Sequence, residues 1–309
     1  MEEPFISIVS PVYKAESIIQ ELVNRIEVEI KKITSKYEII LVEDCSPDDS
    51  WNRIFEIAQK NKKVKGIKFS KNFGQHFAIT AGLYNTQGDY VIVMDCDLQH
   101  DPKYIPILYN KVFEGYDIVY TYNQIRKHSI VKNFFAKLYN SVFNFLSESV
   151  EAHYNVGSFS LISRKVVEQF LRIKDRHRHY LLLLRWLGFN STYVEIEHLE
   201  RHSGKSSYSL KKLINHAIDG IISQSLVLLR LSIFIGFIYF VLSMIGSIYL
   251  IIMHYLHGYL QGWASLVVLL LLSTGLILMA VGVSSIYIGN VFDQVRERPL
   301  YVISEKINL

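Results

Sequence analysis

Two long uncharged runs near the C-terminal end constrain this chain more than any other feature of its sequence. Residues 231–253 and residues 263–292 contain no Asp, Glu, Lys or Arg. Each run is longer than the roughly 20 residues that cross a bilayer about 30 Å thick. Buried helices of a soluble core are rarely so long and so uniformly apolar. We therefore predict a transmembrane hairpin, with spans at about residues 231–256 and 263–290.

The placement of basic residues predicts the orientation of this hairpin. Residues 254–262, between the two runs, contain no Lys or Arg. Basic residues flank the runs on their other sides: Lys205, Lys211, Lys212, Arg230, Arg296 and Arg298. Lys and Arg concentrate on the cytoplasmic side of a membrane. The N-terminal sequence opens with two acidic residues and lacks a signal-peptide pattern. We expect a multi-pass protein of the inner (cell) membrane with both termini in the cytoplasm.

Charge and small residues bear on possible partners. The formal net charge of +4 is modest, so nucleic acid is not an expected partner. Cys45 and Cys96 are expected to remain reduced thiols in a reducing compartment. Small residues within the uncharged runs would permit close helix contacts between protomers, so a homo-oligomer is possible: Gly236, Gly246, Gly275 and Gly282.

The first third of the chain alternates apolar strands with amphipathic helices. Strands are predicted at residues 5–10, 37–42, 64–69 and 90–94, and helices at 18–33, 49–60 and 75–84. This alternation is typical of an α/β fold with a mostly parallel sheet. After an apolar segment at 117–121, aromatic and basic residues at 129–146 favour a helix lying at the membrane interface, although packing on the sheet is an alternative. Residues 211–230 form a second candidate interfacial helix.

Four polar loops follow the four predicted strands, and such loops meet at the carboxyl edge of a parallel sheet. Asp95 and Asp97 directly follow the fourth strand, and hard oxygen ligands of this kind suit Mg²⁺ or Mn²⁺. Tyr13 could stack on a base, and the 43–48 loop offers carboxylates for a base edge or ribose, although Asp48 or Asp49 could instead cap the next helix. Gly74 begins a helix whose free N–H groups would face an anion. The set suits a nucleotide-sugar with its metal. The sequence contains no P-loop and no GxGxxG motif.

The order of these motifs resembles family 2 glycosyltransferases, and in particular the polyisoprenyl-phosphate glycosyltransferase group. The segments 7–13 with Glu16, 42–48, 71–74 with 81–83, 95–99, 156–167 and 201–208 are each similar to a motif of that group, and together they span the chain. The resemblance implies a GT-A-type Rossmann-like fold with flanking helices, followed by interfacial helices and the hairpin. It divides the chain into a cytoplasmic catalytic domain (1–208), a juxtamembrane amphipathic helix (209–230), the hairpin (231–292) and a cytoplasmic tail (293–309).

The resemblance also implies roles for individual residues. The metal would be bound by Asp95, Asp97 and Gln99. The nucleotide-sugar would contact Pro11, Tyr13, Glu16, Glu43, Asp44, Lys71 and Asp95. The acceptor phosphate would contact Arg126, Lys127, Arg201 and Ser206. Asp97, Asp95 and Arg201 would be the catalytic residues.

This chain departs from the motifs of the group at two places. Ser158 and Ser160 replace an Asp and an Arg, and that Asp has been proposed as a base in relatives; Ser207 replaces a Lys. A lipid monophosphate has a second pKa of about 6 and is largely ionised near neutral pH. Such a nucleophile needs positioning and charge neutralisation rather than a general base.

The predicted activity is that of a glycosyltransferase of EC class 2.4. It would transfer a single sugar, with inversion, from a nucleoside-diphosphate sugar, most simply UDP-linked, to a membrane polyprenyl phosphate. One alternative is a processive polysaccharide synthase, suggested by Arg185 and Trp186, although helix packing accounts better for that pair. Another is a membrane scaffold that binds nucleotide-sugar without turnover. A metal hydrolase using His177 and His179 lacks an evident third ligand.

Overall fold

The computed structural model describes residues 3–123, 156–176, 178–197, 227–257 and 262–309. These residues divide between two compact units. The first unit takes its described residues from 1–128, 152–207 and 298–309, and the second takes them from 208–297. Each unit is described by itself below.

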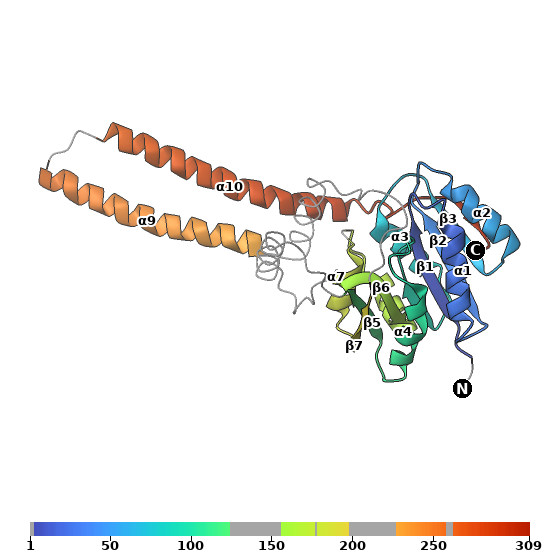
Figure 1. Cartoon of the computed structure of the whole chain (residues 1–309). Helices are drawn as coiled ribbons and strands as arrows, with labels where there is room; N and C mark the ends of the chain where they lie inside the picture. Colours follow the sequence, from blue (N-terminus) through green and yellow to red (C-terminus); the bar gives the residue numbers. More distant parts are fainter. Residues whose placement is uncertain (1–2, 124–155, 177, 198–226, 258–261) are drawn as a thin grey trace. The chain divides into compact units, whose positions relative to one another are not determined.

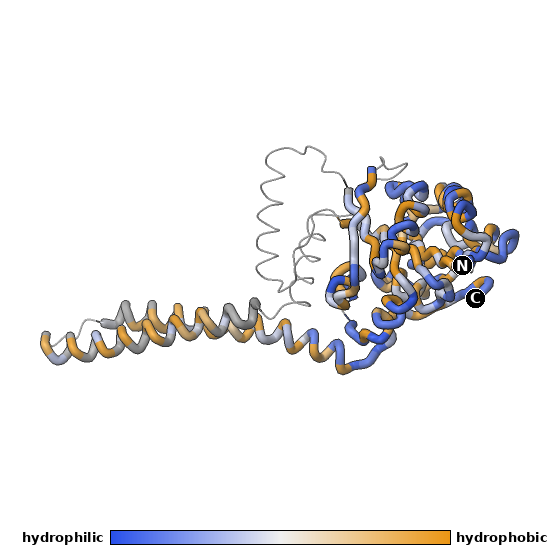
Figure 2. The backbone as a smooth tube through the Cα atoms, turned by 90° about the horizontal axis from the view of Figure 1, so that it is seen from below, coloured by the Kyte–Doolittle hydropathy of each residue, from blue (hydrophilic) through white to orange (hydrophobic). Residues whose placement is uncertain are grey.

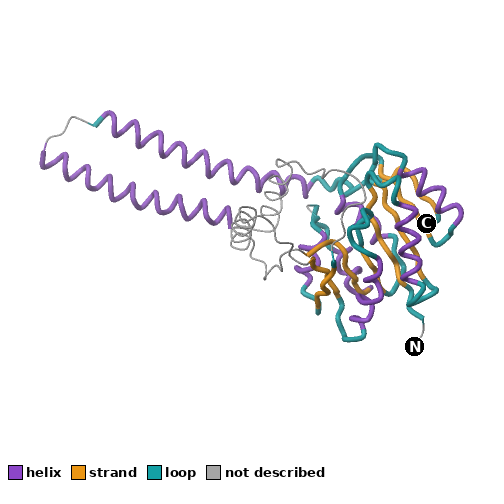
Figure 3. The backbone as a smooth tube through the Cα atoms, in the orientation of Figure 1, coloured by secondary structure: helices purple, strands orange, loops and turns teal. Residues whose placement is uncertain are grey.

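The first unit is built on an eight-stranded sheet, whose strands are orange in Figure 3. The strand order is β7-β5-β6-β4-β1-β2-β3-β8. Strands β1 to β4, β5 and β7 point the same way, whereas β6 and β8 run antiparallel to their neighbours. The bounds are β1 (Ile6–Val12), β2 (Tyr37–Glu43), β3 (Val64–Phe69), β4 (Tyr90–Val93), β5 (Ile118–Asn123), β6 (Val156–Ser163), β7 (Ser191–Ile196) and β8 (Ile303–Ile307).

Helices cover both faces of this sheet. One face packs against α1 (Ile19–Ile30), α2 (Ser50–Lys60) and α4 (Ile105–Val112), which follows the 3₁₀ turn η1 (Pro102–Tyr104). The other face packs against α3 (Gln75–Tyr84), α6 (Arg164–Arg172) and α7 (Tyr180–Leu187). Successive residues of β1 and β2 enter opposite cores, so both strands are fully buried. Burial on both faces explains why most of their residues are apolar.

The helix α3 lies unusually close to β1. A Cβ atom at Gly82 would collide with the side chain of Val9. Only glycine therefore allows this distance between helix and strand. This contact is the physical reason for a glycine in the Ala-Gly-Leu segment at residues 81–83.

The predicted α/β fold is confirmed, and the strands and helices predicted between residues 5 and 94 are present with small shifts at their ends. The predicted interfacial helix at 129–146 lies outside the described residues. Of the one predicted at 211–230, only residues 227–230 are described, and they form the start of α9. In α7, Arg185 is half-buried, whereas Trp186 beside it is 72% exposed. Packing was therefore the wrong explanation for Trp186.

Strand β8 brings residues from the far end of the chain into the sheet. It pairs antiparallel with β3, and the Trp51 indole N–H donates a 3.1 Å hydrogen bond to Glu305, which also forms a 2.8 Å ion pair with Lys68. The Asn308 amide donates to the carbonyls of Ala58 (2.7 Å) and Val64 (2.8 Å). These contacts make residues 303–308 part of the first unit, which their polar sequence did not predict.

Asn308 is expected to be a major contributor to the attachment of β8. Its backbone has φ of 60°, which Asn tolerates better than Ala. We expect Asn308→Ala to destabilise the sheet by about 1–2 kcal/mol, since it loses two hydrogen bonds and strains the backbone. Thermal unfolding in detergent measures this as a lower Tm. Asn308→Gly keeps the backbone conformation and isolates the amide contribution; an unchanged Tm in both variants would contradict this role.

The second unit contains two long helices, α9 (Val227–His257) and α10 (Trp263–Val295). They lie side by side in Figures 1 and 2, and the Tyr239 hydroxyl contacts the Leu269 carbonyl at 3.5 Å. Figure 2 shows orange, hydrophobic residues along much of their length. Within the described part of the chain, one segment, Leu272–Val295, is long and apolar enough to cross a membrane, and none of it is buried by protein.

Candidate functional site

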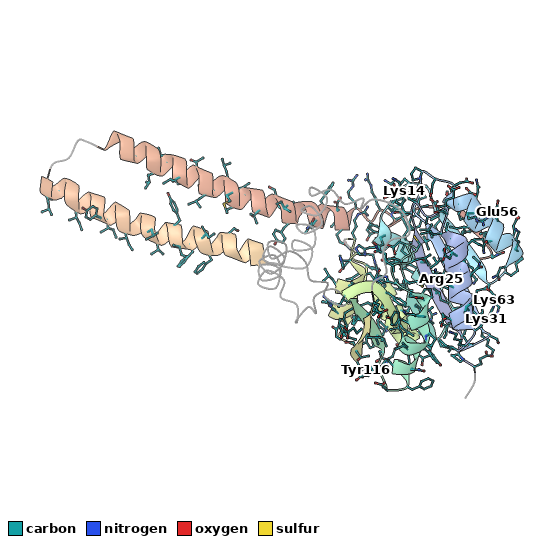
Figure 4. All side chains as sticks on the ribbon, in the orientation of Figure 1. Lys14, Arg25, Lys31, Glu56, Lys63 and Tyr116 are labelled. Atoms are coloured by element: carbon teal, nitrogen blue, oxygen red, sulfur yellow. The ribbon has the colours of Figure 1, made fainter. Side chains whose placement is uncertain are left out.

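Five segments meet at the carboxyl edge of the sheet. The loops after β1, β2, β3 and β4 leave from this edge because these four strands are parallel. Strand β6 is antiparallel to β4, so its first residues begin at the same edge. Lys14 marks this edge in Figure 4, and Lys31 and Lys63 mark the opposite end of the sheet. The predicted convergence of polar loops is therefore present in the fold.

Hydrogen bonds from backbone N–H groups to side chains join the loops after β1 and β2. The Lys14 N–H donates to the Ser46 hydroxyl at 2.8 Å. The Glu16 N–H donates to Asp48 at 3.2 Å, and the Asp49 N–H donates to Glu16 at 3.2 Å. Asp48 also accepts from the hydroxyl of Ser50, the first residue of α2. Glu16 and Asp48 therefore fix the shape of these loops, whether or not they also contact a ligand.

Asp44 fixes the loop after β3. Its two carboxylate oxygens accept the N–H groups of Phe73 (2.7 Å) and Gly74 (2.8 Å). Gly74 has φ of +103°, a conformation that favours glycine. Burial raises the pKa of Asp44 above its ordinary value, against the opposing effect of these two bonds. The arrangement makes Asp44 a brace for the 72–74 segment.

Glu43 differs from Asp44 because part of its carboxylate has no partner. The side chain is 1% exposed, and one oxygen accepts the Ser46 N–H. The other oxygen, Oε2, is buried without a hydrogen-bond partner within the described residues. Burial raises the pKa of Glu43. A buried acceptor of this kind suits an N–H or O–H donor supplied by a ligand.

Glu43→Gln is expected to stabilise the unliganded fold at neutral pH. A carboxyl group with a raised folded-state pKa destabilises the fold increasingly as pH rises through that pKa. The variant should therefore match the parent in acid and exceed it by about 1 kcal/mol near pH 7, the order of an unsatisfied buried oxygen. Tm measured against pH tests this, with the exposed Glu56→Gln as control. A pH-independent difference would contradict it.

Asp95 is held on both sides at the end of β4. Its Oδ1 accepts from the Gln75 side-chain amide at 2.6 Å, and its Oδ2 accepts from the Ser158 hydroxyl at 2.8 Å. Burial raises the pKa of Asp95, while the charge of His100 and these hydrogen bonds oppose the rise. The two bonds connect the loop after β4 to α3 and to β6. They fix the orientation of the carboxylate.

Alternate residues after β4 face inward and outward. Cys96, Leu98 and His100 are buried, whereas Asp95, Asp97 and Gln99 remain partly exposed at the edge. The Gln99 N–H donates to Asp97 at 3.1 Å, and Leu98 has φ of 56°. This tight turn presents three oxygen-bearing side chains together.

These side chains fit a hydrated divalent cation. Mg²⁺ and Mn²⁺ are held by one or two carboxylates, with phosphate oxygens and water completing the shell. No group of three His, Cys, Asp or Glu residues of metal-site geometry occurs among the residues that the structure describes. A soft, thiolate-rich site is also disfavoured, because burial raises the pKa of Cys96 to about 12. Asp95, Asp97 and Gln99 offer hard oxygen ligands, which suit a hydrated divalent cation.

The remaining predicted nucleotide-sugar contacts lie along the same edge. Tyr13 is 43% exposed, as a residue that stacks on a base must be. The Lys71 ammonium lies 5.0 Å from the centre of the Phe73 ring. Pro11 is buried within β1, opposite Val42, and contributes backbone and shape. Tyr13 and Lys71 are the members of this set with accessible side chains.

The predicted acceptor-phosphate residues lie outside the described residues: Arg126, Lys127, Arg201 and Ser206. His177 of the hydrolase alternative also lies outside them. Described stretches end at residue 123, the last of β5, and at residue 197, one residue after β7. The carboxyl ends of both strands point to the same edge as those of β1 to β4.

The sequence did not identify Gln75, Ser160 and Tyr180 as site residues. Gln75 directly follows Gly74 at the start of α3, and that position alone pointed to the site edge. The sequence marked Ser160 only as a replacement of an Arg and gave no signal for Tyr180, because their contact depends on the antiparallel register of β6 and on the packing of α7.

Comparisons with known proteins agree with this geometry. The sheet and its carboxyl-edge site define a GT-A-like α/β fold, and the crystal structure of mannosyl-3-phosphoglycerate synthase from Rubrobacter xylanophilus shares it (TM-score 0.52, 14% identity, 71% of this chain and 72% of that chain). The model of glycosyl transferase family 2 matches residues 7–171. The chain belongs to this family and is a glycosyltransferase.

Two curated relatives match nearly the whole chain. "Uncharacterized glycosyltransferase YkcC" of Bacillus subtilis (strain 168) is 34% identical over 98% of this chain and 94% of the relative. Undecaprenyl-phosphate 4-deoxy-4-formamido-L-arabinose transferase of Shewanella sediminis (strain HAW-EB3) is 31% identical over 97% of this chain and 92% of the relative. The similarity therefore extends beyond the catalytic sheet into the long helices.

Proposed function

We propose that this protein transfers one sugar, with inversion at the anomeric carbon, from a UDP-linked sugar to a membrane polyprenyl phosphate. The observation that carries the proposal is the series of hydrogen bonds at one sheet edge that joins Asp44 to residues 73–74, and the neighbouring Gln75 to Asp95 and Ser158. The full-length similarity to a relative whose name specifies undecaprenyl phosphate supports the choice of acceptor.

The reaction forms one bond and breaks one. An oxygen of the lipid phosphate attacks the anomeric carbon, and the bond from that carbon to the nucleoside diphosphate breaks, with its electron pair leaving on the diphosphate. The lipid phosphate is already ionised near neutral pH, because its second pKa is about 6. This chemistry removes the need for a base at Ser158, whose hydroxyl donates to Asp95 instead.

In the proposal, Asp97 and Gln99, with Asp95, hold Mg²⁺ or Mn²⁺, which neutralises charge on the leaving diphosphate when bound. Glu43 accepts a hydrogen bond from the nucleoside, and Tyr13 stacks on the base. Lys71 contributes positive charge near the phosphates. Arg126, Lys127, Arg201 and Ser206 bind the acceptor phosphate. The role of the protein is positioning and electrostatic stabilisation.

We also propose that α9 and α10 both cross the membrane, as a hairpin with both ends in the cytoplasm. Many large apolar side chains on the two helices are exposed to the surroundings, which suits contact with lipid. The basic residues Arg296 and Arg298 after α10 favour a cytoplasmic end there. The hairpin would keep the catalytic unit at the level of the lipid phosphate.

A donor screen tests this function. The purified full-length protein is incubated with a panel of UDP- and GDP-sugars, polyprenyl phosphate in detergent, and Mg²⁺ or Mn²⁺. The expected result is a glycolipid from one UDP-sugar. A polymer product would favour a processive synthase, and tight donor binding without any product would favour a non-catalytic scaffold; either result would overturn the proposal.

A further inference from the structure

A line of hydrogen bonds joins Asp95 to the interior of the first unit. Its first member, Ser158, lies near the start of β6 and donates to Asp95. The register of β4 and β6 pairs Val93 with Ser160, and its continuation brings Ser158 opposite Asp95. The contact is therefore fixed by strand pairing rather than by a flexible loop.

The line continues through Ser160. This side chain is fully buried, and its hydroxyl lies 3.0 Å from the Ser158 carbonyl and 2.8 Å from the Tyr180 hydroxyl. A serine hydroxyl has one proton to donate. Since the carbonyl can only accept, the proton of Ser160 points to the Ser158 carbonyl. The Tyr180 hydroxyl must then donate to Ser160.

Tyr180 is suited to this donor role. It is 1% exposed at the start of α7, and its ring packs edge-on against Phe170 at 5.8 Å. Burial raises the pKa of Tyr180, so its hydroxyl keeps its proton throughout the working pH range. The small side chain at position 160 leaves the space that the Tyr180 hydroxyl occupies. The line thus has one direction, from Tyr180 through Ser160 to the Ser158 backbone.

We propose that Tyr180 and Ser160 are positioning residues for the transferase reaction: they hold the Ser158 segment so that the Ser158 hydroxyl fixes the Asp95 carboxylate at the donor site. This proposal rests on the proposed function, because it assigns the fixed carboxylate to the nucleotide-sugar. It gives the two serines at positions 158 and 160 a joint role with Tyr180.

A double-mutant cycle in the full-length protein tests the line. We expect Ser158→Ala to lower kcat/KM for the donor about 10–100-fold, the order of one hydrogen bond to a charged group. Tyr180→Phe should lower it about 3–10-fold, as for one neutral bond acting indirectly. In the Ser158→Ala background, Tyr180→Phe should have almost no further effect on kcat/KM, because the line then ends before Asp95.

Two control variants separate positioning from stability. Tyr37→Phe removes the hydroxyl of another buried tyrosine, at the start of β2 and away from the carboxyl edge, and should leave kcat/KM within about twofold of the parent. Ser158→Thr keeps the hydroxyl and should restore most of the activity lost in Ser158→Ala.

Additive effects of Tyr180→Phe and Ser158→Ala on kcat/KM would overturn the positioning proposal. So would a Ser158→Thr variant as impaired as Ser158→Ala. Because the parent protein makes glycolipid in either case, such results leave the proposed function standing. A parent protein that makes no glycolipid with any donor would instead contradict the proposed function itself.

Discussion

An Asp97→Ala variant is expected to lose glycolipid formation by about 10³-fold, the order expected when several kcal/mol of charge stabilisation on the leaving group is removed. Asp97 is partly exposed at the sheet edge and accepts a hydrogen bond from the nearby Gln99 N–H. The protein should therefore fold normally, with a Tm close to that of the parent.

Asp101→Ala is the matched control for this experiment. Asp101 belongs to the same acidic segment, but its carboxylate caps η1 through the Lys103 N–H at 3.0 Å. Loss of the cap should cost about 1 kcal/mol of stability and leave the reaction rate within about twofold. Equal rates for the parent and Asp97→Ala would contradict the assignment of Asp97.

A Ser158→Asp variant is expected to lose activity by about 10²-fold or more, because it places a second carboxylate against Asp95 and removes a hydrogen-bond donor. The Ser158 hydroxyl lies 2.8 Å from Asp95. Two carboxylates at that distance do not both ionise readily. The negative charge would disturb the site even though related motifs carry an Asp at this position.

Ser158→Asn is the control for shape. Asn has nearly the same size as Asp but offers N–H donors and no charge. We expect it to retain at least ten times the activity of Ser158→Asp, in proportion to the repulsion removed. A higher rate for Ser158→Asp than for the parent would show that a base at position 158 speeds the reaction. This result would contradict the account of an acceptor phosphate that is already ionised.

The sequence predicted the parallel half of the sheet because its strands are buried on both faces. Strands β1, β2 and β4 are mostly apolar in sequence and can be recognised without knowledge of their partners. Strand β6 contains three serines, and β8 contains Glu305 and Lys306. Such strands are recognisable only from partners far away in the chain, as in the bond from Trp51 to Glu305.

For the site, too, the sequence predicted some features and could not predict those that depend on contacts between distant residues. The rule that loops meet at the carboxyl edge of a parallel sheet correctly grouped the loops that carry Glu43 and Asp95. It could not assign the individual carboxylates, since an aspartate that braces a loop resembles one that binds a ligand. Asp44 was predicted to contact the nucleotide, and both of its oxygens accept backbone N–H groups. Gln75 and Tyr180 became visible only through contacts between elements.

The most direct test of the proposed function is the mass of the product made by the full-length protein from its UDP-sugar donor in the presence of an equal mixture of polyprenyl phosphate and polyprenol. The account predicts that only the phosphate is consumed, and that its mass increases by a single sugar residue. Glycosylation of polyprenol, addition of several sugars, or release of free sugar with no change in either lipid would contradict it.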